Sequence, residues 1–145
     1  MMSDFSRVFL DTAPIIYFLN LNSSFRFKAE QILSTMIARD CDIVTSAITC
    51  AEYLVHPYRS NNFLAVNAFW SFLEDSNVHI ANIDTATAEK AAKIRAEYPG
   101  FKAFDSMQLA CACNSGCDLF LTNDKQLKQF TGIPCVTVEE WEFLD

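Results

Sequence analysis

The stretch Arg7-Val8-Phe9-Leu10-Asp11 combines a short apolar run with an acid at its end. A second run, Leu119-Phe120-Leu121-Thr122-Asn123, ends in the same way and is followed by Asp124. Short apolar runs of this kind are typical of strands that are buried on both faces of a parallel sheet. Ligands of such sheets bind beyond the carboxyl ends of the strands. The two acids are therefore expected to lie in one crevice.

The rest of the chain alternates strands and helices, which predicts an α/β fold. We expect residues 1–145 to form a single domain with a central parallel sheet of about five strands, flanked by helices and joined by right-handed crossovers. The expected strands are 7–10, 42–46, 78–83, 119–122 and 135–138. The expected helices are 14–20, 25–39, one from about 48 that stops before Pro57, one capped by Asn61 or Asn62 that runs to 75, 85–98, 105–114, 125–130 and 139–144.

The composition is that of a globular domain, because 51% of the residues are hydrophobic and 20% are charged. No apolar run approaches the ~20 residues that a membrane-spanning helix needs, and the first residues lack the pattern of a secretory signal. The protein is therefore expected in the cytoplasm. In that reducing compartment the six cysteines are expected to be thiols.

The formal net charge of −7 argues against a large basic face for nucleic acid. A site that holds cations escapes part of this objection, because bound metal ions attract phosphate. Eight basic residues are candidates for the surroundings of such a cleft: Arg7, Arg26, Lys28, Arg39, Arg59, Lys102, Lys125 and Lys128.

Two further acids are predicted at the same edge of the sheet as Asp11 and Asp124. Glu52 lies one turn into an expected helix, and Asp105 lies at the start of another. Four carboxylates in one crevice repel one another unless a cation joins them. Their oxygen atoms suit Mg²⁺ or Mn²⁺, and two such ions about 3.5–4 Å apart can activate a water and stabilise the departing oxygen of a phosphodiester. The pattern indicates a metal-dependent nuclease.

Each acid also has an ordinary structural interpretation. Asp105 and Asp124 suit helix N-caps, and Glu52 suits an exposed position on a helix. Asp11 is the hardest to explain in this way, because it directly follows a buried strand. Taken together at one end of one sheet, the four acids favour a site.

Four segments of the chain resemble, in order, the four acidic motifs of PIN domains. They are residues 8–12 (VFLDT), 45–52 (TSAITCAE), 104–110 (FDSMQLA) and 119–124 (LFLTND). The small single-domain size further resembles the VapC-type toxins of bacterial and archaeal toxin–antitoxin pairs. The resemblance covers nearly the whole chain.

The resemblance implies an endoribonuclease that uses Mg²⁺ or Mn²⁺. It implies four metal ligands, of which the last binds directly or through water: Asp11, Glu52, Asp105 and Asp124. It gives three hydroxyl residues the role of supporting these acids by hydrogen bonding: Thr12, Ser46 and Thr122. Asn123 is either a further support or a plain turn residue.

The implied reaction is in-line attack on an RNA phosphodiester by a water that the metal activates, without a covalent enzyme intermediate. The RNA would be single-stranded or looped, because its bases must be accessible. The implied partners are this RNA, a cognate antitoxin protein and a second copy of the chain in a homodimer. No membrane partner is implied.

The helix that ends near residue 75 is more apolar than one buried stripe requires. It carries Phe63, Leu64, Val66, Phe69, Trp70, Phe72 and Leu73. Two interpretations stay open: a deeply packed helix, or a groove near Phe63 and Trp70 that binds a partner helix.

Other functions fit the sequence less well. A catalytically silent PIN-like module that binds RNA or protein would be expected to have lost acids, and all four are present. A receiver or phosphatase would be expected to have a second acid after Asp11, where Thr12 and Ala13 stand. The three glycines form no phosphate-binding loop. These residues do not separate a growth-arresting toxin from a housekeeping RNA-processing nuclease.

Overall fold

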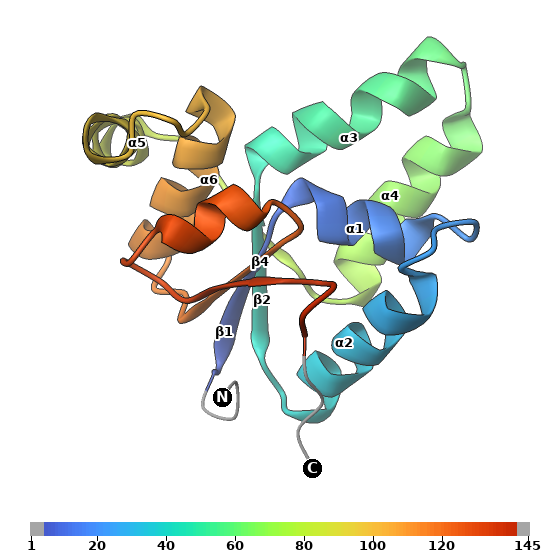
Figure 1. The fold of residues 1–145 in the computed structure, drawn as a ribbon. Helices are drawn as coiled ribbons and strands as arrows, with labels where there is room; N and C mark the ends of the chain where they lie inside the picture. The colour runs from blue at the N-terminus through green and yellow to red at the C-terminus, as the bar shows by residue number, and fades with distance from the viewer. Residues whose placement is uncertain (1–4, 142–145) are drawn as a thin grey trace.

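The computed structural model describes residues 5–141 and contains a five-stranded, fully parallel sheet. The strands lie in the order β3-β2-β1-β4-β5, so β1 is central (Figure 1). Their bounds are β1 Arg7–Leu10, β2 Asp42–Ser46, β3 His79–Ala81, β4 Leu119–Thr122 and β5 Cys135–Thr137. The predicted α/β architecture with about five parallel strands is confirmed.

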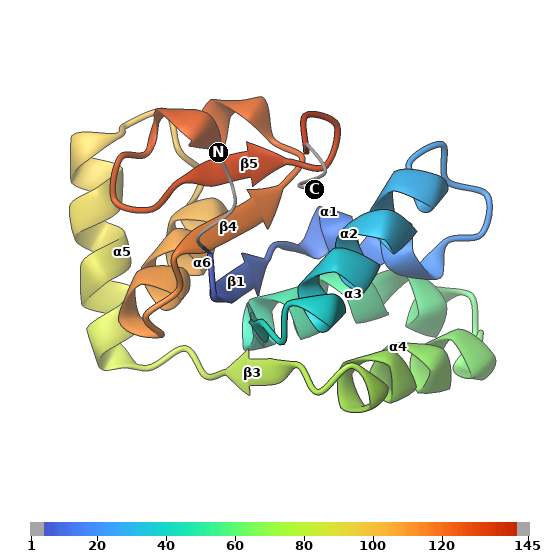
Figure 2. The same cartoon turned by 90° about the horizontal axis from the view of Figure 1, so that it is seen from below.

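Between residues 5 and 141, six α-helices and one 3₁₀-helix surround the sheet. They are α1 Thr12–Leu19, α2 Arg26–Ala38, α3 Ala47–Arg59, α4 Phe63–Asp75, α5 Thr85–Glu97, α6 Ala103–Asn114 and the 3₁₀-helix η1 Lys125–Gln129. Figures 1 and 2 show α1 to α4 on one side of the sheet and α5 and α6 on the other. None of the helices between residues 5 and 141 is long and apolar enough to cross a membrane.

The two faces of the sheet contribute to two separate apolar clusters. Along β1, Val8 and Leu10 pack with α1, α2 and α4, whereas Phe9 packs with α5 and α6. On that second face the rings of Phe9 and Phe120 stack with centroids 5.2 Å apart. Side chains of a strand alternate between faces, so a strand covered on both sides is apolar throughout. This explains why β1 and β4 have the bounds that the sequence predicts.

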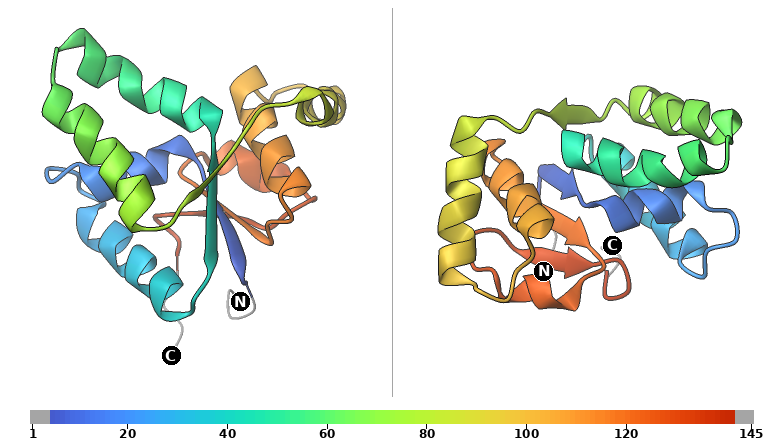
Figure 3. Two further views of the ribbon diagram at one scale, coloured as in Figure 1. Left: turned by 180° about the vertical axis from the view of Figure 1, so that it is seen from behind. Right: turned by 90° about the horizontal axis from the view of Figure 1, so that it is seen from above.

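The strand register brings the carboxyl ends of the central strands to the same level. Leu10 pairs with Leu121, and the backbone N–H of Asp11 donates to the carbonyl of Leu121 at 2.9 Å. On the other side of β1, Phe9 pairs with Val44. The helices α1 and α3 begin directly after β1 and β2 at this edge, and Figure 3 shows α3 and α4 extending from it as a hairpin.

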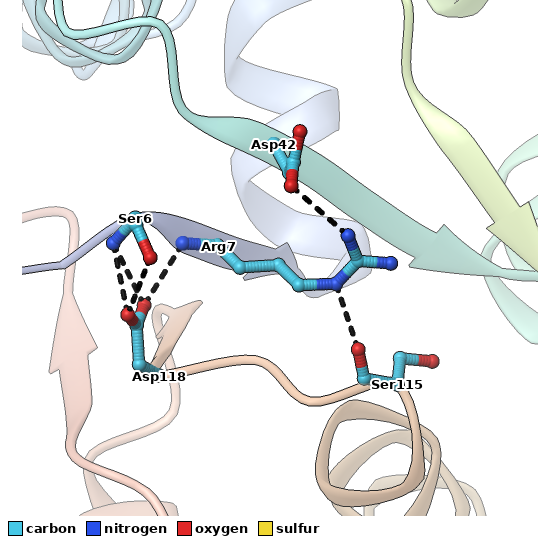
Figure 4. A network of polar contacts seen from close by, with 5 residues as sticks. All are labelled: Ser6, Arg7, Asp42, Ser115 and Asp118. Atoms are coloured by element: carbon cyan, nitrogen blue, oxygen red, sulfur yellow. Dashed lines mark hydrogen bonds and ion pairs between the residues drawn. The ribbon is translucent and has the colours of Figure 1, made fainter.

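The opposite, amino edge of the sheet is joined by polar contacts (Figure 4). Arg7 donates from Nη1 to Asp42 at 3.1 Å and from Nε to the carbonyl of Ser115 at 2.7 Å. The carboxylate of Asp118 accepts from the backbone N–H groups of Ser6 and Arg7 at 2.9–3.1 Å. These contacts tie the first strand to β2 and to the turn before β4.

The prediction that a helix stops before Pro57 is wrong, because α3 continues to Arg59. Proline removes one backbone donor and is most damaging in the middle of a helix. Pro57 lies in the last turn, where the N–H of Ser60 still bonds to the carbonyl of His56 at 3.1 Å. The N–H of Asn62 then bonds to Pro57 at 2.8 Å. These two hydrogen bonds close the last turn of α3, although Pro57 itself has no backbone N–H to donate.

Other bounds differ by smaller amounts. The third strand is shorter than residues 78–83, because β3 pairs with β2 only from His79 to Ala81. The helix predicted to open at Asp105 begins two residues earlier. The predicted helix 139–144 is not formed in its described part, where residues 138–140 are a turn; residues 142–144 lie outside the described residues. Of the two residues predicted as alternatives, Asn62 caps α4, accepting from the N–H of Ala65 at 3.1 Å.

Candidate active site

The carboxyl edge of the sheet gathers the four predicted acids. Asp11 lies between β1 and α1, Glu52 on α3, Asp105 on α6, and Asp124 between β4 and η1. The pKa of Asp105 is raised to about 6, first by burial and then by the negative charges of the other three acids. A carboxylate feels such charges only when they are near. Four segments that are distant in the sequence therefore share one negative field.

Asp11 is the most enclosed of the four, with 8% of its surface exposed. Its Oδ1 accepts from the backbone N–H of Thr12 at 2.9 Å and from Nε2 of Gln108 at 3.3 Å. Its Oδ2 accepts from the hydroxyl of Thr122 at 2.8 Å. Burial raises the pKa of Asp11, and these hydrogen bonds only partly oppose it. The carboxylate is held in one orientation at the N-terminus of α1.

Glu52 and Asp124 are more open to solvent than Asp11. Glu52 is exposed on α3, and its Oε1 accepts from the hydroxyl of Thr12 at 2.7 Å. Asp124 is half-buried and caps η1, accepting from the N–H of Gln126 at 3.0 Å. Asp124 therefore caps a helix, as one interpretation of the sequence predicted, and it lies at the carboxyl edge of the sheet with the other acids.

Asp105 does not cap its helix. Lys102 is the residue before α6, and Asp105 is half-buried in the first turn. In that position its carboxylate is free of the backbone N–H contact that a cap residue makes. The capping interpretation of Asp105 is wrong.

The four predicted supporting residues divide into three groups. Thr12 and Thr122 contact acids directly. Ser46 caps α3 and donates to Oε1 of Gln108, so it reaches Asp11 only through that amide. Asn123 donates to the hydroxyl of Tyr17 at 2.8 Å, and the structure gives it no contact with an acid.

Two polar residues of this site have no role in the sequence analysis, although both stand in the quoted motifs. Gln108 is 1% exposed and Thr49 is fully buried. Nε2 of Gln108 donates to Thr49 at 2.8 Å as well as to Asp11. The available signal was a lone amide one turn after Asp105 in an otherwise apolar part of the helix. A buried amide needs partners, and its position points it toward the acids.

At least two of the candidate basic residues lie away from the acids, and one lies near them. Arg7 lies at the opposite edge of the sheet, where it bonds to Asp42 and Ser115. Arg26 pairs with Glu30 on α2 at 2.6 Å. Lys102 is near enough to lower the pKa of Asp105, although less than the acids raise it. The field at this edge is therefore strongly negative.

The donor chemistry of the site suits a hard divalent cation. The donors are carboxylate oxygens, and Mg²⁺ commonly binds one or two carboxylates while it keeps several waters. The pKa of Asp105 is raised first by burial and then by the negative charges of the other acids, and a cation would relieve this repulsion. Within residues 5–141, no three His, Cys, Asp or Glu side chains converge closely enough to cage a metal ion. The carboxylates Asp11, Glu52 and Asp124 are instead held by protein hydroxyl and N–H donors.

A sequence model of the PIN domain matches residues 8–133, which is most of the chain. The chain belongs to the PIN-domain family. This confirms the resemblance of the four acidic segments. None of the curated proteins compared with this PIN domain is detectably similar to it in sequence.

Several solved structures have the same fold. A toxin–antitoxin complex from Klebsiella pneumoniae matches with a TM-score of 0.67 and 25% identity, over 90% of this chain and 97% of the other. VapBC2 from Rickettsia felis, bound to a promoter DNA fragment, matches with a TM-score of 0.71 and 17% identity, over 90% of this chain and 98% of the other. VapC20 from Mycobacterium tuberculosis, a sarcin–ricin loop cleaving toxin, matches with a TM-score of 0.67 and 15% identity, over 87% of this chain and 98% of the other. The family match and these structural likenesses together show that the chain has the PIN-domain fold.

Proposed function

We propose that this PIN domain is a metal-dependent endoribonuclease that hydrolyses RNA phosphodiester bonds. The observation that carries the proposal is the gathering of four carboxylates at one sheet edge, where burial and then the charges of the other three acids raise the pKa of Asp105 to about 6. Such a site binds Mg²⁺ or Mn²⁺ at the expense of protons. An RNA substrate is supported by the likeness of the fold to VapC20, which cleaves the sarcin–ricin loop.

The four acids would hold the metal with different freedom. Asp11 is enclosed and fixed by three hydrogen bonds, so it is the anchor. Glu52 and Asp124 are more exposed and can turn toward a cation once it neutralises the field. The bound metal would supply positive charge beside the scissile phosphate and lower the pKa of a water. Thr12 and Thr122 would keep Glu52 and Asp11 oriented throughout.

The partner that we propose is an antitoxin whose bound segment is apolar and ends in a cation. A groove of about 460 Å³ lies between α1, α3 and α4. Ile16, Leu19 and Tyr53 give it apolar walls, and Glu52 stands in its lining. A partner that follows the groove therefore reaches the negative site, where a basic side chain is favourable. Neighbouring folds in toxin–antitoxin complexes support such a partner.

The helix α4 has apolar side chains both in the core and on the surface. Val66, Phe69 and Leu73 are buried, whereas Phe63 and Leu64 are 58% and 83% exposed. An exposed patch of large apolar side chains marks an interaction surface. We propose that this surface serves the antitoxin or a homodimer, and light scattering of the isolated chain separates the two.

The test of the proposed function is cleavage of a mixed pool of structured RNA. Wild type, Asp105→Asn and Asp75→Asn are each incubated with Mg²⁺, Mn²⁺ or EDTA. Asp75 lies exposed at the end of α4 and gives the same change of charge away from the site. We expect wild type and Asp75→Asn to cut with metal only, and Asp105→Asn not to cut.

Two other outcomes have definite meanings. Cleavage that persists in EDTA would contradict the metal dependence. Folded wild type that cuts nothing in any metal, yet retains RNA or a protein on a column, would favour the silent binding module. Growth arrest on expression of wild type but not of Asp105→Asn would support the toxin over a housekeeping nuclease.

A further inference from the structure

Gln108 connects three elements of the site through a buried side-chain amide. Its Oε1 accepts from the hydroxyl of Ser46, at the start of α3. Its Nε2 donates to Asp11 after β1 at 3.3 Å and to Thr49 of α3 at 2.8 Å. An amide nitrogen has two hydrogens, so both are used. The residue sits on α6, one turn after Asp105, and is 1% exposed.

The hydrogen bonds of this network link the two acids through Thr49. The hydroxyl of Thr12 donates to Oε1 of Glu52 at 2.7 Å and to the hydroxyl oxygen of Thr49 at 3.2 Å, so its single hydrogen is shared. Thr49 also accepts from Nε2 of Gln108. The chain of contacts therefore joins Asp11 to Glu52 through Gln108, Thr49 and Thr12.

We propose that Gln108 is a positioning residue that sets the distance between Asp11 and Glu52 and thereby tunes the affinity of the site for a divalent cation. The proposal rests on the proposed function. It assigns to a residue outside the acid set the task of holding α6, α3 and the end of β1 in one geometry. Asp105 is on the same helix face one turn away, so its position depends on the same amide.

The chemistry of an amide suits this task better than that of any residue of similar size. Methionine would fill the space but would leave one oxygen of Asp11 and the hydroxyl of Thr49 without their donor. Glutamate would place a further carboxylate beside Asp11 and raise the repulsion. Glutamine is neutral, accepts from Ser46 and donates to two partners.

The first experiment measures Mn²⁺ binding by calorimetry in wild type, Gln108→Met and Thr87→Val. Thr87 is a buried residue of α5 that donates to Asp84 at 2.8 Å, so its variant loses one hydrogen bond to a carboxylate far from the site. We expect Gln108→Met to bind Mn²⁺ about 10- to 100-fold more weakly. Thr87→Val should bind like wild type. Wild-type affinity in folded Gln108→Met would overturn the proposal.

A second variant keeps the proposal testable if Gln108→Met does not fold. Thr49→Val interrupts the chain while it keeps the amide, and we expect a several-fold weaker binding of Mn²⁺. Because both changes cut one chain, Gln108→Met and the double variant should bind alike. If the losses of Mn²⁺ affinity in the two single variants add up in the double variant, Gln108 and Thr49 do not act through one chain of hydrogen bonds. Unaltered affinity in Thr49→Val would overturn this chain as well.

Cleavage assays distinguish positioning from a merely structural role. In Gln108→Met the metal concentration for half-maximal cleavage should rise, while the rate at saturating metal stays within a few-fold of wild type. A wild-type protein that binds no Mn²⁺ would instead refute the proposed function itself. Binding by wild type and equal binding by Gln108→Met would refute only the role of Gln108.

Discussion

The two ends of the central strand handle charge in opposite ways. At the amino end, Arg7 neutralises Asp42, and Asp118 accepts from the backbone of Arg7 and Ser6 (Figure 4). Burial opposes ionisation of Asp118, but those hydrogen bonds outweigh it and lower its pKa. At the carboxyl end, burial and neighbouring acids raise the pKa of Asp11 and Asp105. The acids at the amino end thus have polar partners that favour their charged form, whereas the environment of Asp11 and Asp105 at the carboxyl end disfavours it.

The largest difference between the two ends should appear in activity. We expect Asp11→Asn and Asp105→Asn each to reduce RNA cleavage at least about 100-fold, because each removes a carboxylate proposed to hold the metal. Glu52→Gln should behave similarly. Initial rates on a fixed RNA, with folding checked by circular dichroism, provide the measurement. Asp118→Asn, at the other end, is the matched control and should cut like wild type once folded. Full activity in Asp105→Asn would contradict the assignment of these acids as the active site.

Divalent cations should stabilise only through the carboxyl end. At 100 times the dissociation constant, a ligand specific for the folded state adds about 2.7 kcal/mol to the free energy of unfolding. We expect a gain of this order when Mn²⁺ is added to wild type or to Asp118→Asn. Asp105→Asn should gain much less. Thermal unfolding with Mn²⁺ and with EDTA tests this, and an equal gain in all three proteins would show that the cation binds elsewhere.

The amino end should matter for stability and little for chemistry. Asp118→Ala removes the acceptor of the backbone N–H groups of Ser6 and Arg7, and we expect a loss of about 1–2 kcal/mol in the free energy of unfolding. Urea denaturation measures it. Asp75→Ala is the control for loss of an exposed acid and should change stability by less than about 0.5 kcal/mol. A loss no larger than that of the control would mean that this network adds nothing.

The two ends should respond to pH with opposite signs in EDTA. An unfolded aspartate titrates near pH 4. The pKa of folded Asp105 is about 6, so the folded protein binds the extra proton and becomes less stable as the pH rises from about 4 to 6. The lowered pKa of Asp118 gives stability that is present above about pH 4 and is lost as the pH falls through its folded value.

Variants separate these two contributions. Asp105→Asn should be about 1 kcal/mol more stable than wild type at pH 7.5 and equal to it near pH 4, the order expected for a half-exposed cluster of like charges. Asp118→Asn should be less stable at pH 7.5, with the difference shrinking in acid. Urea denaturation across this range gives both curves. A rise in the stability of wild type between pH 4 and 6 that Asp105→Asn removes would contradict the sign.

The sequence predicted the centre of the fold better than its margins. The bounds of β1, β2 and β4 are as predicted. In β1 and β4, which are covered on both faces, most residues are apolar, so these strands stand out in the sequence. β3 is an edge strand that pairs only with β2, so Ile83 continues the apolar run but not the ladder. The end of α3 was predicted too early because the effect of a proline depends on which turn of the helix it occupies. The backbone N–H groups that close the last turn of α3 belong to residues after Pro57.

The acids could be predicted because each follows or opens an element, and parallel strands bring such positions together. The partners of the acids could not. Gln108 meets Asp11 only because α6, α3 and β1 converge in three dimensions, and the residues are 97 positions apart. Asn123 stands beside Asp124 in the sequence, yet it bonds to Tyr17 of α1. Asn123 was considered as a hydrogen-bond partner of the acids because it precedes Asp124 in the sequence. In the structure it is Gln108 that donates a hydrogen bond to an acid.

The hydrogen bond from Thr122 to Asp11 has a consequence for biosynthesis. It joins residues 111 positions apart, and β1 pairs with β4 on the same side. A growing chain has its first acid from the beginning, but β4, which pairs with the central strand, and the fourth acid are made only after about four fifths of the chain. Closure of such a long loop also comes late in folding. An unfinished chain that ends before β4 therefore lacks Thr122 and Asp124 and cannot assemble the acid cluster.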